Sequence, residues 1–273
     1  MQSTYKQSFS KQTFIELLAI LIVAVFLGGL LTGCTTMAPQ KEAEEALRSD
    51  SRVLVKQGKF LAFEPLAGAG VSATEEAQGN AGSAFPSIGL IIYPGAKVDP
   101  RAYAPQAKAL AAQGYLVAIV PVAFSFAIFS PNRADWVLHA YPEIQNWVVA
   151  GHSLGGVAAA QYAVRHKNQI RGIVFWASYP ASDISQSGIP VLSISASLDG
   201  LATPEKVEGY KKNQPADTQY VVIQGGNHAQ FGWYEPQKGD RAATISAEEQ
   251  TAQIVEATAA FLQKLEKAYG GLQ

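Results

Sequence analysis

The sequence predicts an α/β protein built on a mainly parallel, doubly wound β-sheet. From residue 87 onward, short continuous apolar runs alternate with segments of helical periodicity, the pattern of strands covered on both faces by helices. The apolar run 147–150 leads through a glycine-rich turn into a helix of small residues. Apolar residues at helical spacing over 254–265 indicate a final amphipathic helix. Because strands and helices alternate, we expect a parallel sheet.

The predicted elements follow one another at short intervals. Residues 52–56 and 59–64 flank Gln57-Gly58 and are predicted to form a β-hairpin, and the Gly-, Ala- and Ser-rich stretch 67–84 a loop. The predicted strands that follow are 88–93, 115–122, 146–150, 172–177, 191–197 and 220–224. The predicted helices are 105–113, 132–140, 156–166, 204–212 and a last one that starts at the capping pair Ser246 and Glu249 and ends at Gly270-Gly271.

Composition and charge exclude several classes of protein. The chain has 273 residues, of which 48% are hydrophobic and 16% charged, so it is too apolar to be disordered and long enough for a sizeable core. Its 21 basic and 22 acidic residues nearly cancel, which argues against a nucleic-acid partner. A single cysteine excludes an internal disulfide and a cysteine-based metal cluster. No metal or other cofactor is predicted, and the sequence does not indicate the oligomeric state.

The N-terminal segment has the features of a targeting signal. Lys6 and Lys11 precede an apolar stretch over 14–31 that contains a single charged residue, Glu16. The stretch closes on Leu31-Thr-Gly-Cys34, which resembles the lipobox of bacterial lipoproteins, where the cysteine is acylated and becomes the first residue of the mature chain. An uncleaved membrane helix or a free cysteine are the alternatives.

The lipobox resemblance implies a division of the chain and a location. Residues 1–33 would be the signal peptide, 34–50 a tether or short helix, and 51–273 a single domain. Removal of 1–33 leaves 19 basic and 21 acidic residues, a net charge of −2, so the attachment would rely on acyl chains rather than a basic patch. We therefore expect an extracytoplasmic protein held at a membrane through Cys34.

The segment Gly151-His-Ser153-Leu-Gly155 is the most informative motif of the chain. It is a G-x-S-x-G sequence between a buried strand and a helix, the context of a nucleophile elbow. Ser153 must occupy a strained turn there, and the glycines remove side chains that would collide. The N-terminus of the following helix favours negative charge on a reacting oxygen. Ser153 is therefore the candidate nucleophile.

The order of residues in such folds selects the partners of the serine. A base follows an acid, which follows the serine, and His228 is the histidine that satisfies this order and stands directly beyond a strand. Asp199 is favoured as the acid because it also follows a strand end. The other acidic candidates between the two are Asp183, Glu205, Glu208 and Asp217. His152 is expected to pack at the site rather than act as a second base, and Asn227, Gln230 and Asp240 to order the His228 loop.

The oxyanion hole requires two backbone N–H groups aimed at the reacting oxygen. The residue after the nucleophile, Leu154, is expected to supply one. The loop after the strand 88–93 is expected to supply the other, and we assign it to Ala96, next to Gly95.

Together with this elbow, three segments resemble the α/β-hydrolases, and specifically the small, broadly defined group called family 5. The segments are Tyr93-Pro-Gly-Ala-Lys-Val-Asp-Pro100 with Tyr103-Ala-Pro105, Leu198-Asp-Gly-Leu-Ala-Thr-Pro204, and Gly225-Gly-Asn-His-Ala-Gln-Phe231. The resemblance, over residues 87–262, implies that Ser153, Asp199 and His228 form a triad that hydrolyses an ester-like bond. The chain departs from many relatives at Ala96, where they have a second glycine. Ser153 argues against the similar dienelactone hydrolases, which usually carry cysteine.

The site is expected to be uncapped, because only residues 178–189 separate two strands where many relatives insert a cap. Aromatic residues near strand ends are candidates for an apolar substrate pocket. They are Tyr93, Phe124, Phe126, Phe129, Trp176, Tyr179, Trp233 and Tyr234.

We therefore expect a lipid-anchored serine hydrolase that cleaves a small carboxylic ester through an acyl-enzyme. An acyltransferase or a peptidase could use the same triad. A surface lipoprotein that binds a ligand without catalysis is the alternative outside enzymes, because fold alone does not establish activity.

Overall fold

The computed structural model describes residues 36–66 and 86–269. The chain divides into two units, Met1–Thr36 and Met37–Gln273, and the second contains the fold described below. The predicted signal segment over 1–33, Cys34, the predicted loop over 67–84 and the glycines after residue 269 lie outside the described residues.

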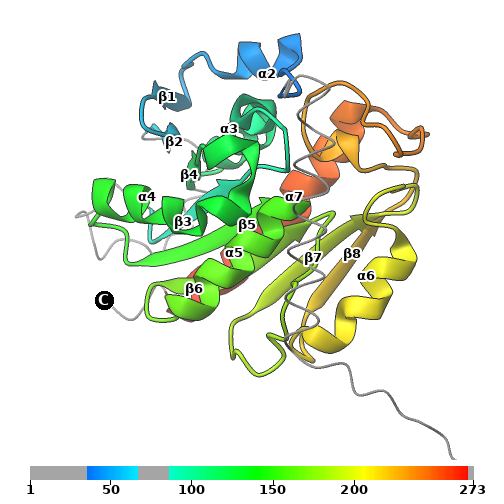
Figure 1. Ribbon diagram of the computed structural model, residues 1–273. Helices are drawn as coiled ribbons and strands as arrows, with labels where there is room; N and C mark the ends of the chain where they lie inside the picture. The colour runs from blue at the N-terminus through cyan, green and yellow to red at the C-terminus, as the bar shows by residue number, and fades with distance from the viewer. Residues whose placement is uncertain (1–35, 67–85, 270–273) are drawn as a thin grey trace, which may run out of the picture. The chain divides into compact units, whose positions relative to one another are not determined.

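Within the described residues, eight strands form one sheet with the spatial order β1-β2-β4-β3-β5-β6-β7-β8 (Figure 1). They are β1 (Val53–Gln57), β2 (Leu61–Pro65), β3 (Ile88–Tyr93), β4 (Leu116–Ile119), β5 (Asn146–His152), β6 (Ile170–Trp176), β7 (Val191–Ala196) and β8 (Gln219–Ile223). β2 pairs antiparallel with both β1 and β4, whereas every other pair is parallel. The predicted parallel sheet is confirmed, and the predicted hairpin forms one edge of it.

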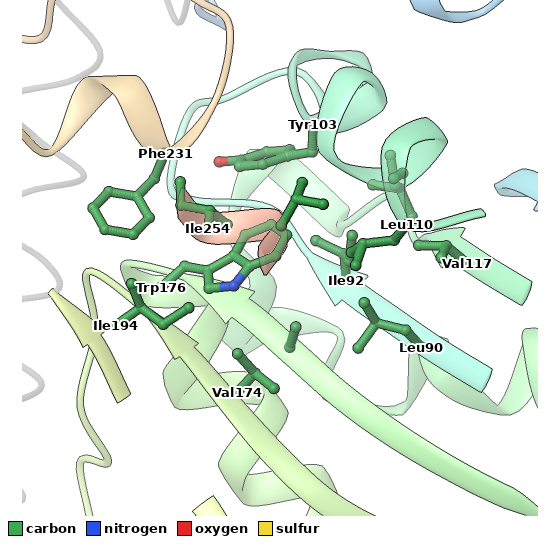
Figure 2. Close-up of a cluster of buried hydrophobic side chains, with 14 of the residues drawn as sticks. Leu90, Ile92, Tyr103, Leu110, Val117, Val174, Trp176, Ile194, Phe231 and Ile254 are labelled. Atoms are coloured by element: carbon green, nitrogen blue, oxygen red, sulfur yellow. The ribbon is translucent and has the colours of Figure 1, made fainter. Parts of the chain in front are cut away.

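Strand β3 shows how the sheet divides two apolar cores. All its residues are buried, which explains the continuous apolar run. Leu90 and Ile92 belong to the core on one face, while Ile91 and Tyr93 belong to the core on the other, because successive side chains of a strand point in opposite directions. Figure 2 shows the first core, where Leu90 and Ile92 share the interior with Trp176.

Helices cover both faces of the sheet. They are α2 (Lys41–Ala46), α3 (Ala104–Ala111), α4 (Ala134–Ala140), α5 (Leu154–Arg165), α6 (Pro204–Tyr210) and α7 (Ala247–Tyr269). α3 and α7 pack into the core that contains Leu90, and α4 and α5 into the core that contains Ile91. The predicted start of α7 is confirmed, since the Glu249 N–H donates to Ser246 Oγ at 3.1 Å. In the described part of the chain, no helix has both the length and the apolar character needed to span a bilayer.

Several boundaries differ from the prediction at the carboxyl ends of the strands. β4 ends at Ile119, ahead of Pro121, a residue that cannot donate to a neighbouring strand. β5 continues to His152, so Ser153 follows the strand directly. α4 begins only after a 3₁₀ turn, η4 (Pro131–Arg133). Between β6 and β7, residues 177–190 contain neither a helix nor a strand, so this connection forms no cap domain.

Residues 37–50, predicted as tether or short helix, lie on the surface of the folded unit. The Met37 N–H donates to the Lys97 carbonyl at 2.7 Å, and the Gln40 N–H donates to the Trp233 carbonyl at 2.8 Å. The short helix is α2, which packs against α3 and buries Ala43. The chain therefore joins the domain at Met37, beside the loop that follows β3.

Candidate active site

Ser153 lies in the sharp turn between β5 and α5. Its backbone angles, φ 51° and ψ −122°, are rarely adopted by residues other than glycine, and such strain persists only where the surroundings hold it. Two glycines permit the turn. A Cβ on Gly151 would lie 2.2 Å from the Gly155 carbonyl carbon, and a Cβ on Gly155 would lie 2.3 Å from the Tyr93 carbonyl oxygen. The predicted elbow is therefore a tightly packed junction of β3, β5 and α5.

Ser178 fixes the elbow from the neighbouring strand. Its hydroxyl donates to the Ser153 carbonyl at 2.6 Å, while the Ser153 N–H donates to the Trp176 carbonyl at 3.0 Å. Both backbone polar groups of the nucleophile are thus paired with the end of β6. Ser178 was not predicted from the sequence. The sequence feature that could have indicated it is its position two residues after β6, the strand that pairs with β5.

His228 and Asp199 form a buried pair. His228 Nδ1 lies 2.8 Å from Asp199 Oδ2, and the two side chains are 1% and 0% exposed. Asp199 Oδ1 accepts the N–H groups of Leu201 and Ala202 at 2.8 and 2.7 Å, so the carboxylate cannot turn away. The other imidazole nitrogen, Nε2, is buried and has no hydrogen-bond partner among the described residues. The pair therefore presents one unused nitrogen, the arrangement of an oriented general base.

A second carboxylate, Asp240, joins the acid loop to the base loop. Its Oδ1 accepts the Gly200 N–H at 2.9 Å, and its Oδ2 accepts the Ala229 N–H at 2.8 Å. Gly200 directly follows Asp199, and Ala229 directly follows His228. Asp240 thus orders the histidine loop, as expected, and fixes its distance from the acid.

Asn227 and Gln250 hold the base loop against α7. The Asn227 N–H donates to Gln250 Oε1 at 3.0 Å, and Gln250 Nε2 donates back to the Asn227 carbonyl at 2.8 Å. Asn227 Oδ1 accepts the Gln230 N–H at 3.0 Å, which closes the turn around His228. Gln250 is fully buried and was not predicted, because its helical position gives no sign of a partner 23 residues earlier.

His152 is a second buried imidazole, next to the first. The two rings lie 4.5 Å apart between centroids, and His152 stacks on Phe231. His152 Nδ1 lies 2.8 Å from the Tyr103 hydroxyl, which accepts the Gly95 N–H at 2.9 Å. Burial lowers the pKa of His152 well below its usual value, and the neighbouring His228 imidazole lowers it further, while the His228 carbonyl partly offsets both. His152 is therefore a neutral packing residue at the site.

The predicted oxyanion donors lie on facing segments. Leu154 is the first residue of α5, so its N–H has no acceptor within the helix. The close approach of Gly155 to the Tyr93 carbonyl brings this helix turn against the start of the loop that carries Ala96. In that loop, Ala96 is partly exposed, and the next residue, Lys97, has a left-handed backbone with φ 59°.

The comparisons with known proteins agree with this geometry. The sequence pattern described as the alpha/beta hydrolase family matches residues 89–252, which is more than half of the chain. The chain belongs to the α/β-hydrolase family. No curated protein sequence matches it.

Two solved structures resemble this α/β-hydrolase. One is a thermophilic esterase from Thermogutta terrifontis, which has 12% identity and a TM-score of 0.50 over 65% of this chain and 90% of that one. The other is reported among the metagenome-derived lipolytic enzymes LipS and LipT, and has 15% identity and a TM-score of 0.53 over 67% of this chain and 96% of that one. At these identities the likeness establishes the fold alone.

The structure separates the predicted pocket residues of the hydrolase. Tyr93 is buried, and its hydroxyl bonds the Pro131 carbonyl and the Ala134 N–H. Trp176 is buried in the core (Figure 2), and its Nε1 donates to Thr258 Oγ1 of α7 at 3.3 Å. Trp233 lines a groove of about 1040 Å³ between α3 and α7. Phe124 is 80% exposed. The four residues therefore lie in different surroundings, two in the core, one in the groove and one at the surface.

Metal binding has no support in the described part of the hydrolase. No three His, Cys, Asp or Glu side chains of residues 36–66 and 86–269 lie together in a way that could hold a metal ion. What the site offers is a serine, an imidazole, a carboxylate and backbone N–H groups.

Proposed function

We propose that the protein is a serine hydrolase that cleaves carboxylic esters. The observation that carries this proposal is the buried His228–Asp199 pair, whose Nε2 has no partner among the described residues. The His228 ring lies 4.5 Å, between centroids, from the ring of His152, the residue before Ser153. A serine hydroxyl is a weak nucleophile until a base takes its proton, and this pair can supply that base.

In the proposed reaction, Ser153 Oγ attacks the ester carbonyl and His228 Nε2 takes the serine proton. Asp199 keeps the imidazole proton on Nδ1 and stabilises the imidazolium. The Leu154 and Ala96 N–H groups stabilise the oxyanion. His228 returns the proton to the departing alcohol, and water, activated by the same imidazole, then releases the acid from Ser153.

An ester is the substrate class we favour over a peptide. Both structural neighbours are described as esterases or lipolytic enzymes, and residues 177–190 form no cap over the sheet edge. If the acyl-enzyme reacted with an added alcohol in preference to water, the protein would instead be an acyltransferase.

Replacement of Ser153 by alanine tests the proposal. A fluorophosphonate probe, which reacts with an activated serine, is expected to label the native chain and not the variant. The variant is also expected to hydrolyse nitrophenyl acetate about 10⁵-fold or more slowly than the native chain. Ser182→Ala, at an exposed serine of the loop after β6, is the matched control and is expected to keep both. Equal turnover by Ser153→Ala would contradict the mechanism. A native chain that neither labels nor hydrolyses would be a binding protein.

We also propose that the chain is a lipoprotein anchored through Cys34 outside the cytoplasm. The support is the sequence Leu31-Thr-Gly-Cys34 after the apolar stretch, together with the start of the folded unit at Met37. Cys34→Ala is expected to retain residues 1–33 and lose its acyl mass. Mass spectrometry of the membrane fraction measures both changes, and an unacylated native chain would contradict the proposal.

A further inference from the structure

Three phenylalanines, two of them exposed and Phe126 partly buried, meet in the loop after β4. Phe124 is 80% exposed and Phe129 is 42% exposed, and both the Phe124–Phe129 and Phe126–Phe129 pairs meet edge to face, with centroids 6.3 and 6.1 Å apart. Residues 121–130 contain no charged side chain. We call Phe124, Phe126 and Phe129 the phenylalanine cluster. An exposed apolar group of this kind is typical of a surface that meets a protein or a membrane.

The backbone of the cluster is held in an unfavourable conformation. Phe124 and Ser125 have φ values of 54° and 60°, in the left-handed region that residues with a Cβ rarely adopt. The loop is fixed there by the Ala123 N–H, which donates to Ser130 Oγ at 2.9 Å. This strained backbone exposes the Phe124 ring to solvent, so it does not stabilise the core. We therefore expect the conformation to serve a contact between the ring and a partner outside the domain.

The loop lies beside the segment that carries the proposed oxyanion donor and beside Met37, the first residue of the folded unit. The Ser125 carbonyl accepts the Lys97 N–H at 2.8 Å, and the Lys97 carbonyl accepts the Met37 N–H at 2.7 Å. Lys97 follows Ala96, the proposed oxyanion donor. The turn η3 (Ala127–Phe129) packs against α5, the helix that begins after Ser153. The cluster, the oxyanion loop and Met37 are therefore contiguous.

The chain length between Met37 and Cys34 limits the position of the anchor. Two residues, Thr35 and Thr36, lie between them, and the three residue steps from Cys34 to Met37 span at most about 11 Å. A lipid on Cys34 would therefore hold Met37, and with it the Lys97–Ser125 junction, within that distance of the membrane surface.

We propose that the phenylalanine cluster contacts the phospholipid surface to which Cys34 is anchored, so that the loop carrying Ala96 and Lys97 faces the bilayer. This inference rests on the proposed lipid anchor. A membrane suits the cluster better than a charged partner, because the loop is uncharged and the mature chain has a net charge of only −2. Aromatic side chains that enter the interface add a second attachment to the acyl chains. Membrane-bound esters would then reach Ser153 without crossing water.

A site-specific fluorophore tests the contact. The full chain is expressed as Phe124→Cys, and a thiol-reactive fluorophore is attached, because Cys34 is the sole native cysteine and is blocked if it is acylated. The protein is placed in phosphatidylcholine vesicles with and without nitroxide-labelled lipid. The matched control is Val222→Cys, at a 50% exposed position on the edge strand β8. Both variants are expected to hydrolyse a soluble nitrophenyl ester at the native rate.

Nitroxide lipid is expected to quench the fluorophore at position 124 at least about twice as strongly as the one at position 222. If the chain is acylated and the two positions are quenched equally, or neither is quenched, the membrane contact is overturned. The anchor and the esterase proposal would then remain intact. If the fluorescence at position 124 changes with the amount of protein per vesicle and not with nitroxide lipid, the cluster contacts a second copy of the chain. That result also overturns the membrane contact. A native chain that takes up fluorophore at Cys34 and lacks acyl mass overturns the anchor and this inference together.

Discussion

The site contains two buried histidines that differ mainly in their partners. His228 has a carboxylate, Asp199, on its Nδ1, while His152 has a phenol, Tyr103, on the same atom, and both hydrogen bonds are 2.8 Å long. Both side chains are almost fully buried, and their rings lie 4.5 Å apart.

The two imidazoles are equally buried, so their partners are what distinguishes them for the proposed role of base. Burial disfavours the positive charge that an imidazole acquires with a proton. Asp199 places a negative charge beside His228, whereas His152 has only the neutral Tyr103 hydroxyl as its partner. His228 therefore has the partner that the proposed base requires, and His152 packs at the site and holds Tyr103 over the Gly95 N–H.

Replacement of each imidazole is expected to separate the two roles most clearly. His228→Ala removes the proposed base and is expected to lower kcat for nitrophenyl acetate by about 10⁵-fold. His152→Gln keeps a group that can accept from Tyr103 and is expected to cost about tenfold or less. Steady-state kinetics of both purified variants is the measurement. Equal losses would show that the division of roles is wrong.

Replacement of each partner is expected to give a smaller but still unequal effect. Asp199→Asn removes the charge behind His228 and is expected to lower kcat by about 10⁴-fold with little change in KM. Tyr103→Phe removes the hydroxyl that accepts from Gly95. Because Gly95 adjoins the proposed oxyanion donor Ala96, this variant is expected to lose about tenfold in kcat at an unchanged KM. A Tyr103→Phe effect on KM alone would point to substrate binding instead.

The smallest expected effect is on the pH dependence of stability. The folded-state pKa of His152 lies well below the unfolded value of about 6.5, so below that pH the unfolded chain binds a proton that the folded chain does not. The stability due to neutral His152 is therefore fully present above about pH 6.5 and is lost as the pH falls, at up to about 1.4 kcal/mol per pH unit. Urea unfolding between about pH 7 and pH 5 is expected to show this slope.

His152→Gln is expected to flatten that slope, whereas His139→Gln, at an exposed histidine of α4, is expected to keep it. An unchanged slope in His152→Gln would mean that His152 takes up its proton equally in both states.

The sequence was sufficient where chemistry and chain order constrain each other. The elbow could be predicted at Ser153 because glycines must flank a strained serine, and the choice of His228 and Asp199 followed from their order and their places after strands. The structure brings these two residues together, and the family match supports the fold in which such an order is meaningful.

The sequence was insufficient where a contact depends on how distant segments pack. Tyr103 meets His152 across 49 residues, and Gln250 meets Asn227 across 23, and neither spacing leaves a periodic signal. The surroundings of Trp176 could not be predicted for the same reason. An aromatic residue at a strand end can point into the core or across the site, and helix α7, which closes the core around Trp176, is distant in the sequence.

The clamp between Asn227 and Gln250 has a consequence for the time at which the enzyme becomes active. Gln250 belongs to α7, which follows Ser153, Asp199 and His228 in the sequence, so the base loop has its support only after α7 has packed against the domain. Any reaction that depends on His228 is therefore expected to require the folding of α7.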